Sequence, residues 1–165
     1  MGFIIENAFS LDLESSVINH KGYIPDRYTC EAQNFPPSLS WKDAPANTKT
    51  FVLIFDDQDA DFKPWVHWIL FNMPCDVREI KENISAEDLA EAGIIQGKND
   101  FGKIGYGGPC PPKGKPHRYF FKLYALDKSL SLKEGATKKE VLDSISGHIL
   151  AETKLISSYQ CLKED

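Results

Sequence analysis

Three continuous apolar runs dominate the pattern of hydrophobic and polar positions along the chain. They cover residues 50–55, 65–71 and 119–126, and they are rich in β-branched and aromatic side chains. Runs of this length and composition are typical of strands that are buried on both faces. Only an acidic segment separates the first two runs, so we expect them to be neighbours in one sheet.

Weaker extended signals precede these runs, at residues 3–5 and 23–24. After Pro36 and Pro37, the alternation of Leu39 and Trp41 predicts a short strand with both side chains on one face.

Capping patterns predict the helices. Ser85 precedes a short helix over residues 87–92, and the capping box Thr137-Lys138-Lys139-Glu140 begins a helix that extends to about residue 146. Apolar residues at helical spacing after Gly147 predict a C-terminal helix over residues 149–159. Strands that come before helices along the chain favour a mostly β fold: an antiparallel β-sandwich with short peripheral helices and a C-terminal helix.

Composition narrows the class of protein. A chain of 165 residues, with 42% hydrophobic and 26% charged residues, predicts a single globular domain over residues 1–165. The net charge of -5 argues against nucleic acid as the main partner. No apolar run approaches the roughly 20 residues of a transmembrane segment. The N-terminus lacks the pattern of a signal peptide, and the four cysteines have no CxxC spacing, so we expect a cytoplasmic protein with reduced thiols.

A Gly/Pro-rich loop over residues 106–117 leads directly into the third apolar run. Its prolines restrict the backbone and exclude a helix. A stiff loop of this kind delivers His117, Arg118 and Tyr119 to the start of a buried strand. Binding residues concentrate on loops that a rigid scaffold positions.

Polar residues gather at the ends of the same three predicted strands. Asp57 and Asp59 follow the first, His67 lies in the second beside Trp65, and His117 begins the third. Alternate residues of a strand share a face. We therefore expect Trp65, His67 and Ile69 to lie on one face of the second strand. In the third strand, we expect His117, Tyr119 and Phe121 to share a face. An imidazole in an apolar strand needs a hydrogen-bond partner, and a carboxylate of the acidic segment is the expected one. For His67, a backbone carbonyl is the alternative. Together these residues predict a small polar pocket.

These motifs resemble a known family. Asp57-x-Asp59, Trp65-Val66-His67 and the segment Gly108-Pro109-Cys110-Pro111-Pro112-x-Gly114-x-x-His117-Arg118-Tyr119 are similar to the phosphatidylethanolamine-binding proteins, and above all to their bacterial and archaeal Raf-kinase-inhibitor-like branch. Residues 24–30 and 36–41 share this resemblance.

The resemblance implies a β-sandwich with a metal-free, cofactor-free pocket for phosphate-like head groups. Its ligand-binding residues would be Asp57, Asp59, Trp65, His67, Gly108, His117 and Tyr119. The backbone N–H groups of Gly107 and Gly108 are further expected donors to an anion. Gln58 and Asp61 replace two prolines of the family pattern, and Asp61 near the pocket mouth is expected to repel anions.

We therefore predict a non-catalytic binding or regulatory module. Its ligand would be phosphate, a phosphoethanolamine-like head group or a phosphorylated protein side chain, and the branch allows a homodimer. One alternative is a protease- or kinase-inhibiting protein that acts through its surface. Another is a hydrolase, either metal-dependent through the histidines and carboxylates or with Cys110 and His117 as nucleophile and base. The favoured interpretation of Cys110 is a small buried residue in a proline-rich turn.

Overall fold

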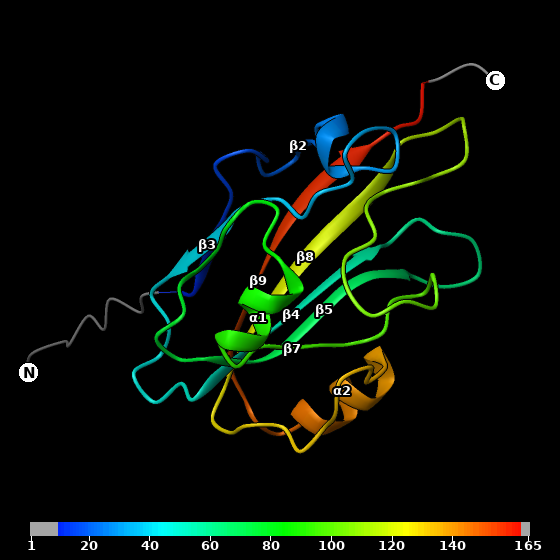
Figure 1. The fold of residues 1–165 in the computed structure, drawn as a ribbon. Helices are drawn as coiled ribbons and strands as arrows, with labels where there is room; N and C mark the ends of the chain where they lie inside the picture. Colours follow the sequence, from blue (N-terminus) through cyan, green and yellow to red (C-terminus); the bar gives the residue numbers. More distant parts are fainter. Residues whose placement is uncertain (1–9, 163–165) are drawn as a thin grey trace, which may run out of the picture.

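Two β-sheets form the body of the protein, and the computed structural model describes residues 10–162 (Figure 1). The large sheet has six strands in the order β2-β9-β8-β4-β5-β7, and the small sheet has three in the order β1-β3-β6. The small sheet consists of β1 (Asp12–Glu14), β3 (Leu39–Lys42) and β6 (Glu79–Ile80). The large sheet consists of β2 (Gly22–Tyr23), β4 (Thr50–Asp57), β5 (Trp65–Pro74), β7 (Ile95–Gln96), β8 (His117–Leu126) and β9 (Ile149–Tyr159). Neighbouring strands are antiparallel, except for the parallel pair β2 and β9.

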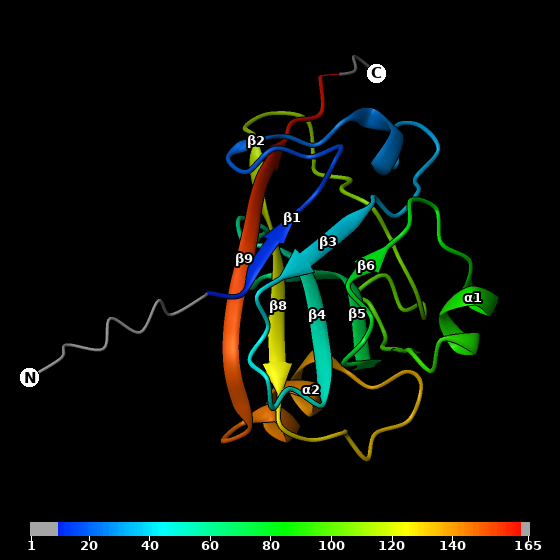
Figure 2. The ribbon, with the colours of Figure 1, turned by 90° about the vertical axis from the view of Figure 1, so that its left-hand side faces the viewer.

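The two sheets pack face to face, as Figure 2 shows, and the main core lies between them. Alternate residues of β4 contribute to this core, among them Phe51 and Phe55. The residues between them, Val52 and Ile54, enter a second core on the other face of the large sheet. Because β4 is covered on both sides, it is buried along its whole length, as its continuous apolar run predicts.

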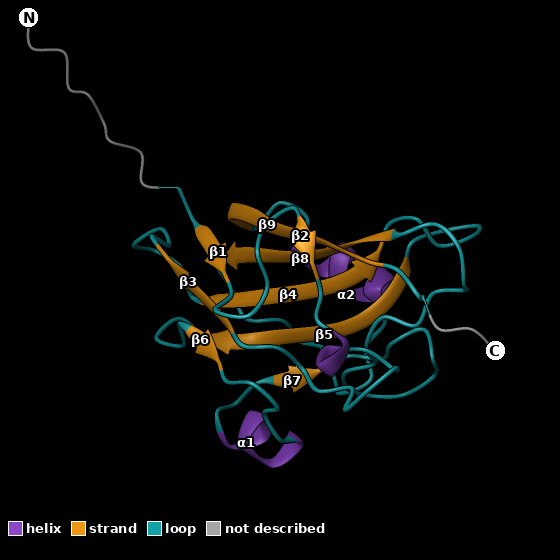
Figure 3. Cartoon of the chain, turned by 90° about the horizontal axis from the view of Figure 1, so that it is seen from above, coloured by secondary structure: helices purple, strands orange, loops and turns teal. Residues whose placement is uncertain are grey.

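Helices lie outside the sheets. The second core is covered by α2 (Lys138–Ile145) through Val141 and Ile145, whereas α1 (Ala86–Glu91) lies beyond the β7 edge (Figure 3). A 3-10 turn, η1, spans Asp26–Tyr28. Within the described part of the chain, no helix has the length and hydrophobicity to span a membrane.

The three predicted long strands and the first two predicted helices are confirmed. The Ser85 side chain caps α1 by accepting a hydrogen bond from the Asp88 N–H, and the capping box of Thr137 and Glu140 opens α2. Leu39 and Trp41 are both buried in β3, as their alternation predicts. The extended signal at residues 3–5 lies outside the described residues.

The predicted C-terminal helix is wrong, because residues 149–159 form the strand β9. Their spacing fits a helix, but Leu155, Ser157 and Tyr159 are buried at alternate positions, which is the period of a strand. β9 pairs with β8 along nearly its whole length and with β2 at its end. This pairing satisfies the backbone in a way that a local pattern cannot reveal.

The expectation of reduced thiols is wrong for two of the four cysteines. Cys30 and Cys110 form a disulfide although 80 residues separate them, while Cys75 and Cys161 are free. Cys110 is also exposed rather than buried. Its sulfur is bonded, so in this state it cannot act as the nucleophile of a thiol hydrolase.

A buried carboxylate ties α2 to the large sheet. The Asp56 side chain is inaccessible to solvent, and its Oδ2 atom lies 2.7 Å from Lys138 Nζ and 3.4 Å from Lys122 Nζ. Its Oδ1 atom accepts a hydrogen bond of 2.6 Å from the Gln58 amide. A buried charge is tolerated only with such partners, so we infer that this network stabilises the fold.

The Lys138→Met substitution is expected to lower the free energy of unfolding by about 1–3 kcal/mol, because it removes the nearer cation from a buried carboxylate. The matched control is Lys139→Met, since Lys139 is the next residue of α2 and its ammonium pairs with Asp143 at the surface. The control should leave the free energy of unfolding nearly unchanged, because solvent screens this exposed pair. Urea unfolding of both variants measures the difference, and equal losses would contradict a stabilising role for the Asp56 network.

Candidate functional site

Three strand ends of the large sheet meet at one point. Asp57, the last residue of β4, lies opposite Trp65 at the start of β5 and opposite Tyr119 near the start of β8. Next to this point is an open cavity of about 280 Å³. Its lining residues are Ala60, Asp61, Trp65, His67, Cys110, Pro112 and His117. The structure thus brings together the two histidines that the sequence singles out.

A β-bulge sets the direction of His67. Phe55 pairs with Trp68 and the next residue, Asp56, pairs with Val66, so His67 is the extra residue of β5. Its ring contacts Phe55 and Tyr119, which belong to the main core between the sheets. The predicted common face of His67 and Ile69 is wrong, because Ile69 points into the second core. Bulges are frequent next to functional sites, where they re-aim a side chain.

His67 is held by a backbone carbonyl rather than by the expected carboxylate. Its Nδ1 atom lies 2.5 Å from the carbonyl oxygen of Gly107. A carbonyl only accepts, so Nδ1 carries the hydrogen and Nε2 is left for other partners. Burial lowers the pKa of His67, and the bond to Gly107 and the nearby Asp57 charge only partly oppose this effect. His67 is therefore neutral at pH 7, with a lone pair on Nε2.

His117 has the carboxylate partner that the sequence predicts. Its Nδ1 atom lies 2.6 Å from Oδ2 of Asp57, whose side chain is only 6% exposed. The other carboxylate oxygen of Asp57 accepts the backbone N–H of Asp59 at 2.8 Å. Because Asp57 is held at both oxygens, it fixes the orientation of the His117 ring. The Nε2 atom of His117 is again the ring nitrogen left for a ligand.

Tyr119 packs behind the histidines. Its ring lies 5.4 Å from that of His67, and its side chain is fully buried. Its hydroxyl makes no hydrogen bond of good geometry among the described residues, although the Asp57 carboxylate lies close enough to act on it. Burial, and next the negative charge of Asp57, raise the pKa of Tyr119, so its proton is retained and remains a potential donor.

Asp59 turns away from the cavity to the protein surface. Its carboxylate pairs with the guanidinium of Arg118 through contacts of 2.9 and 3.0 Å, and this pairing lowers the pKa of Asp59. Of the two predicted carboxylates, only Asp57 therefore contacts a histidine of the cavity.

The amides of Gly107 and Gly108 are already occupied. The Gly107 N–H donates to the His67 carbonyl at 3.0 Å, and the Gly108 N–H donates to the Asn34 side chain at 2.8 Å. The predicted availability of these N–H groups for an anion is wrong. Gly108 instead allows a close approach of two loops, because a Cβ atom there would lie 2.3 Å from the Tyr28 carbonyl oxygen.

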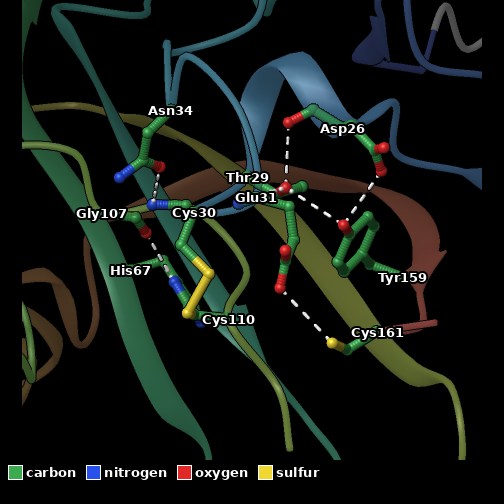
Figure 4. The surroundings of a disulfide bond; sticks show 11 residues. Asp26, Thr29, Cys30, Glu31, Asn34, His67, Gly107, Cys110, Tyr159 and Cys161 are labelled. Atoms are coloured by element: carbon green, nitrogen blue, oxygen red, sulfur yellow. Dashed lines mark hydrogen bonds between the residues drawn. A yellow bond between two sulfur atoms is a disulfide. The ribbon is translucent and has the colours of Figure 1, made fainter. Parts of the chain in front are cut away.

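Four contacts clamp the Gly/Pro-rich loop to residues 28–34. The disulfide is the first of them (Figure 4), and the bond from Gly108 to Asn34 is the second. The Cys30 N–H also donates to the Pro109 carbonyl at 3.1 Å. The Tyr106 hydroxyl also donates to the Tyr28 carbonyl at 2.6 Å. The clamp holds Gly107, the partner of His67, in place.

The predicted set of ligand-binding residues omits several residues around the cavity. Cys110 and Pro112 form part of its wall, and both lie within the Gly/Pro-rich motif that signals the site. The ring of Phe101 packs edge-on against those of Trp65 and His67, with ring centroids 5.6 and 5.4 Å apart. No local pattern distinguishes Phe101 in the sequence.

A metal site has no geometric support in the part of the chain that the structure describes. There, no group of three or more His, Cys, Asp or Glu side chains is arranged to hold a metal ion. The histidine Nδ1 atoms are engaged by Gly107 and Asp57.

Known proteins resemble this chain over nearly its whole length. Residues 14–160 match the family description of a phosphatidylethanolamine-binding protein. A UPF0098 protein of Methanothermobacter thermautotrophicus is 47% identical over 150 residues, which cover 91% of this chain and 99% of the relative. A UPF0098 protein of Aquifex aeolicus is 45% identical, over 83% of this chain and 81% of the relative.

Solved structures share the fold. The crystal structure of a phosphatidylethanolamine-binding protein homologue from Chlamydia trachomatis superposes with a TM-score of 0.84 at 35% identity, and covers 95% of this chain and 99% of that one. E. coli YBCL, described as a member of the mammalian family, superposes with a TM-score of 0.86 at 30% identity, over 92% and 99% of the two chains. The sequence match covers most of the chain, and the solved structures share its fold. The chain therefore belongs to the phosphatidylethanolamine-binding protein family.

Proposed function

We propose that the cavity binds a phosphate-type anion, presented by a small head group or by a phosphorylated side chain, and that the protein acts as a binding or regulatory module without catalysis. The observation that carries this proposal is the meeting of two imidazoles, each tethered through Nδ1, at the wall of one open cavity.

The cavity has the right size for a small polar guest. A volume of about 280 Å³ is many times the roughly 30 Å³ share of one water molecule, and lies near the lower end of small-molecule pockets. Trp65 and Pro112 supply apolar walls, while the histidines supply polar atoms. A phosphate group with a short substituent fits this mixture of surfaces.

Charge in the cavity depends on protonation. Asp61 lines it and Asp57 lies behind His117, so both carboxylates add negative charge at the cavity. A neutral His117 offers only an acceptor at Nε2, whereas a protonated His117 offers a charge-assisted donor. We infer that anion binding is coupled to proton uptake by the imidazoles.

Other features remain predictions from the sequence and from the family resemblance. These are action as a kinase or protease inhibitor, formation of a homodimer and a cytoplasmic location. The cavity fits a phosphorylated partner as well as a small ligand, because both present the same group.

The His117→Asn substitution is expected to weaken phosphate binding about 10- to 100-fold, because it removes a charge-assisted hydrogen bond worth about 1.5–3 kcal/mol. The matched control is His148→Asn, since His148 forms a similar pair with Asp127 at 2.8 Å but does not line the cavity. Isothermal titration calorimetry with inorganic phosphate and with phosphoethanolamine measures both variants. If the two variants bind phosphate equally, the proposed site is wrong.

Sulfate affinity is expected to fall by about tenfold or more as the pH rises from about 5.5 to about 8. Burial lowers the pKa of His67, so this ring gives up its proton at the acid end of the range and can then no longer donate to an anion through Nε2. A bound anion favours the protonated imidazole, so its stabilisation is fully present at low pH and is lost as the proton leaves. Sulfate is the preferred probe because its own charge stays constant over this range. Calorimetric titrations at both pH values that give equal affinity would refute the role of the histidines.

The Asp61→Asn substitution is expected to strengthen phosphate binding by about two- to fivefold, because it removes a negative charge from the cavity wall. Asp76→Asn is the control, since it changes the net charge equally at an exposed turn outside the cavity. Unchanged affinity in the Asp61 variant would show that this carboxylate does not face the bound anion.

A further inference from the structure

Three of the four cysteines gather at one corner of the molecule, where the Gly/Pro-rich loop meets residues 28–34 (Figure 4). Cys30 and Cys110 are bonded, and both residues are exposed. Cys161 follows the end of β9 and is a half-buried free thiol. An exposed disulfide beside a free thiol is an arrangement that permits thiol–disulfide exchange.

The segment that carries Cys161 touches both loops that the disulfide joins. The Gln160 side chain donates to the Gly114 carbonyl at 2.6 Å, in the loop that follows Cys110. The Cys161 thiol donates to the Glu31 carboxylate at 3.4 Å, and Glu31 is the residue after Cys30. These two contacts hold the segment of the free thiol against both loops that the disulfide joins, and they place the thiol next to the residue that follows Cys30.

We propose that Cys30, Cys110 and Cys161 form an exchange site, in which the Cys161 thiol replaces Cys110 as the partner of Cys30. Cys161 loses its proton to water and its thiolate attacks Sγ of Cys30. The bond between Cys30 and Cys110 breaks, and Cys110 leaves as a thiolate that takes up a proton. One disulfide and one thiol are present before and after the step, so no oxidant or reductant is consumed.

The exchange acts on the wall of the cavity. The other clamp contacts are made by Tyr106, Gly108 and Pro109, all of which precede Cys110, so they remain after the exchange. Cys110 then becomes a free thiol in the cavity wall that also contains His117. The effect of this free thiol on a bound anion rests on the function proposed above. The exchange between the three cysteines does not depend on that function.

The Cys110→Ser variant tests the exchange directly. The variant is oxidised in a glutathione redox buffer at about pH 8. We expect the fraction of molecules with a bond between Cys30 and Cys161 to exceed the fraction with a bond between Cys30 and Cys75 by at least about tenfold. Cys75 is a suitable internal control, because it is an exposed free thiol just beyond the far end of β5, about 30 Å along the strand from Trp65. Peptide mapping by mass spectrometry under non-reducing conditions, after acid quenching, quantifies each bond.

The double variant Cys110→Ser/Cys161→Ser is the matched control, in which Cys30 should carry only glutathione. If Cys30 of the single variant also carries only glutathione, or pairs with Cys75 as often as with Cys161, the proposal is overturned. Circular dichroism verifies that the variants are folded.

The unmodified protein provides an independent measurement if the variants fail to fold. After equilibration in the same buffer, the bond between Cys30 and Cys161 is expected in above about 1% of molecules, together with a Cys110 that can be alkylated. Its absence overturns the proposal. The mapping uses no ligand, so failure of anion binding leaves this result unchanged.

Discussion

The pairing of β4 with both β5 and β8 is the constraint on which the site depends. It places Asp57 opposite Trp65 on one side and Tyr119 on the other, so that residues far apart in the sequence share one end of the sheet. The bulge at His67 adds a local correction, because it turns the imidazole toward Tyr119 and the main core. A uniform alternation in β5 would aim this ring at the second core.

Two different tethers give the two histidines different chemistry. The Gly107 carbonyl fixes the His67 ring but brings no full charge, and burial keeps this ring neutral. Asp57 instead brings a nearly buried carboxylate to His117 and fixes its ring through Nδ1. Because the loop that carries Gly107 is clamped by the disulfide and three hydrogen bonds, the position of His67 is coupled to residues 28–34.

Where the chain departs from the family pattern, its structure shows what the new residues do. Gln58 stands at a position of a family proline, yet its backbone N–H donates to the Arg118 carbonyl at 2.9 Å and its side chain contacts the buried Asp56. A proline can make neither contact, so hydrogen bonds here replace a backbone restraint. Asp61, at the other position, lies in the cavity wall and makes the site more negative.

The sequence alone determined the long strands, the helix caps and the motif residues that reveal the family. Each of these features depends on a local pattern of hydrophobicity, capping or residue spacing. Asp57, Trp65, His67 and His117 were recognisable for this reason. The tertiary structure alone decided that residues 149–159 pair as a strand, that a bulge turns His67, that Cys30 bonds to Cys110 and that Asp59 and the glycine amides are engaged elsewhere. Each of these outcomes depends on a partner distant along the chain, and no local pattern specifies which distant groups will meet.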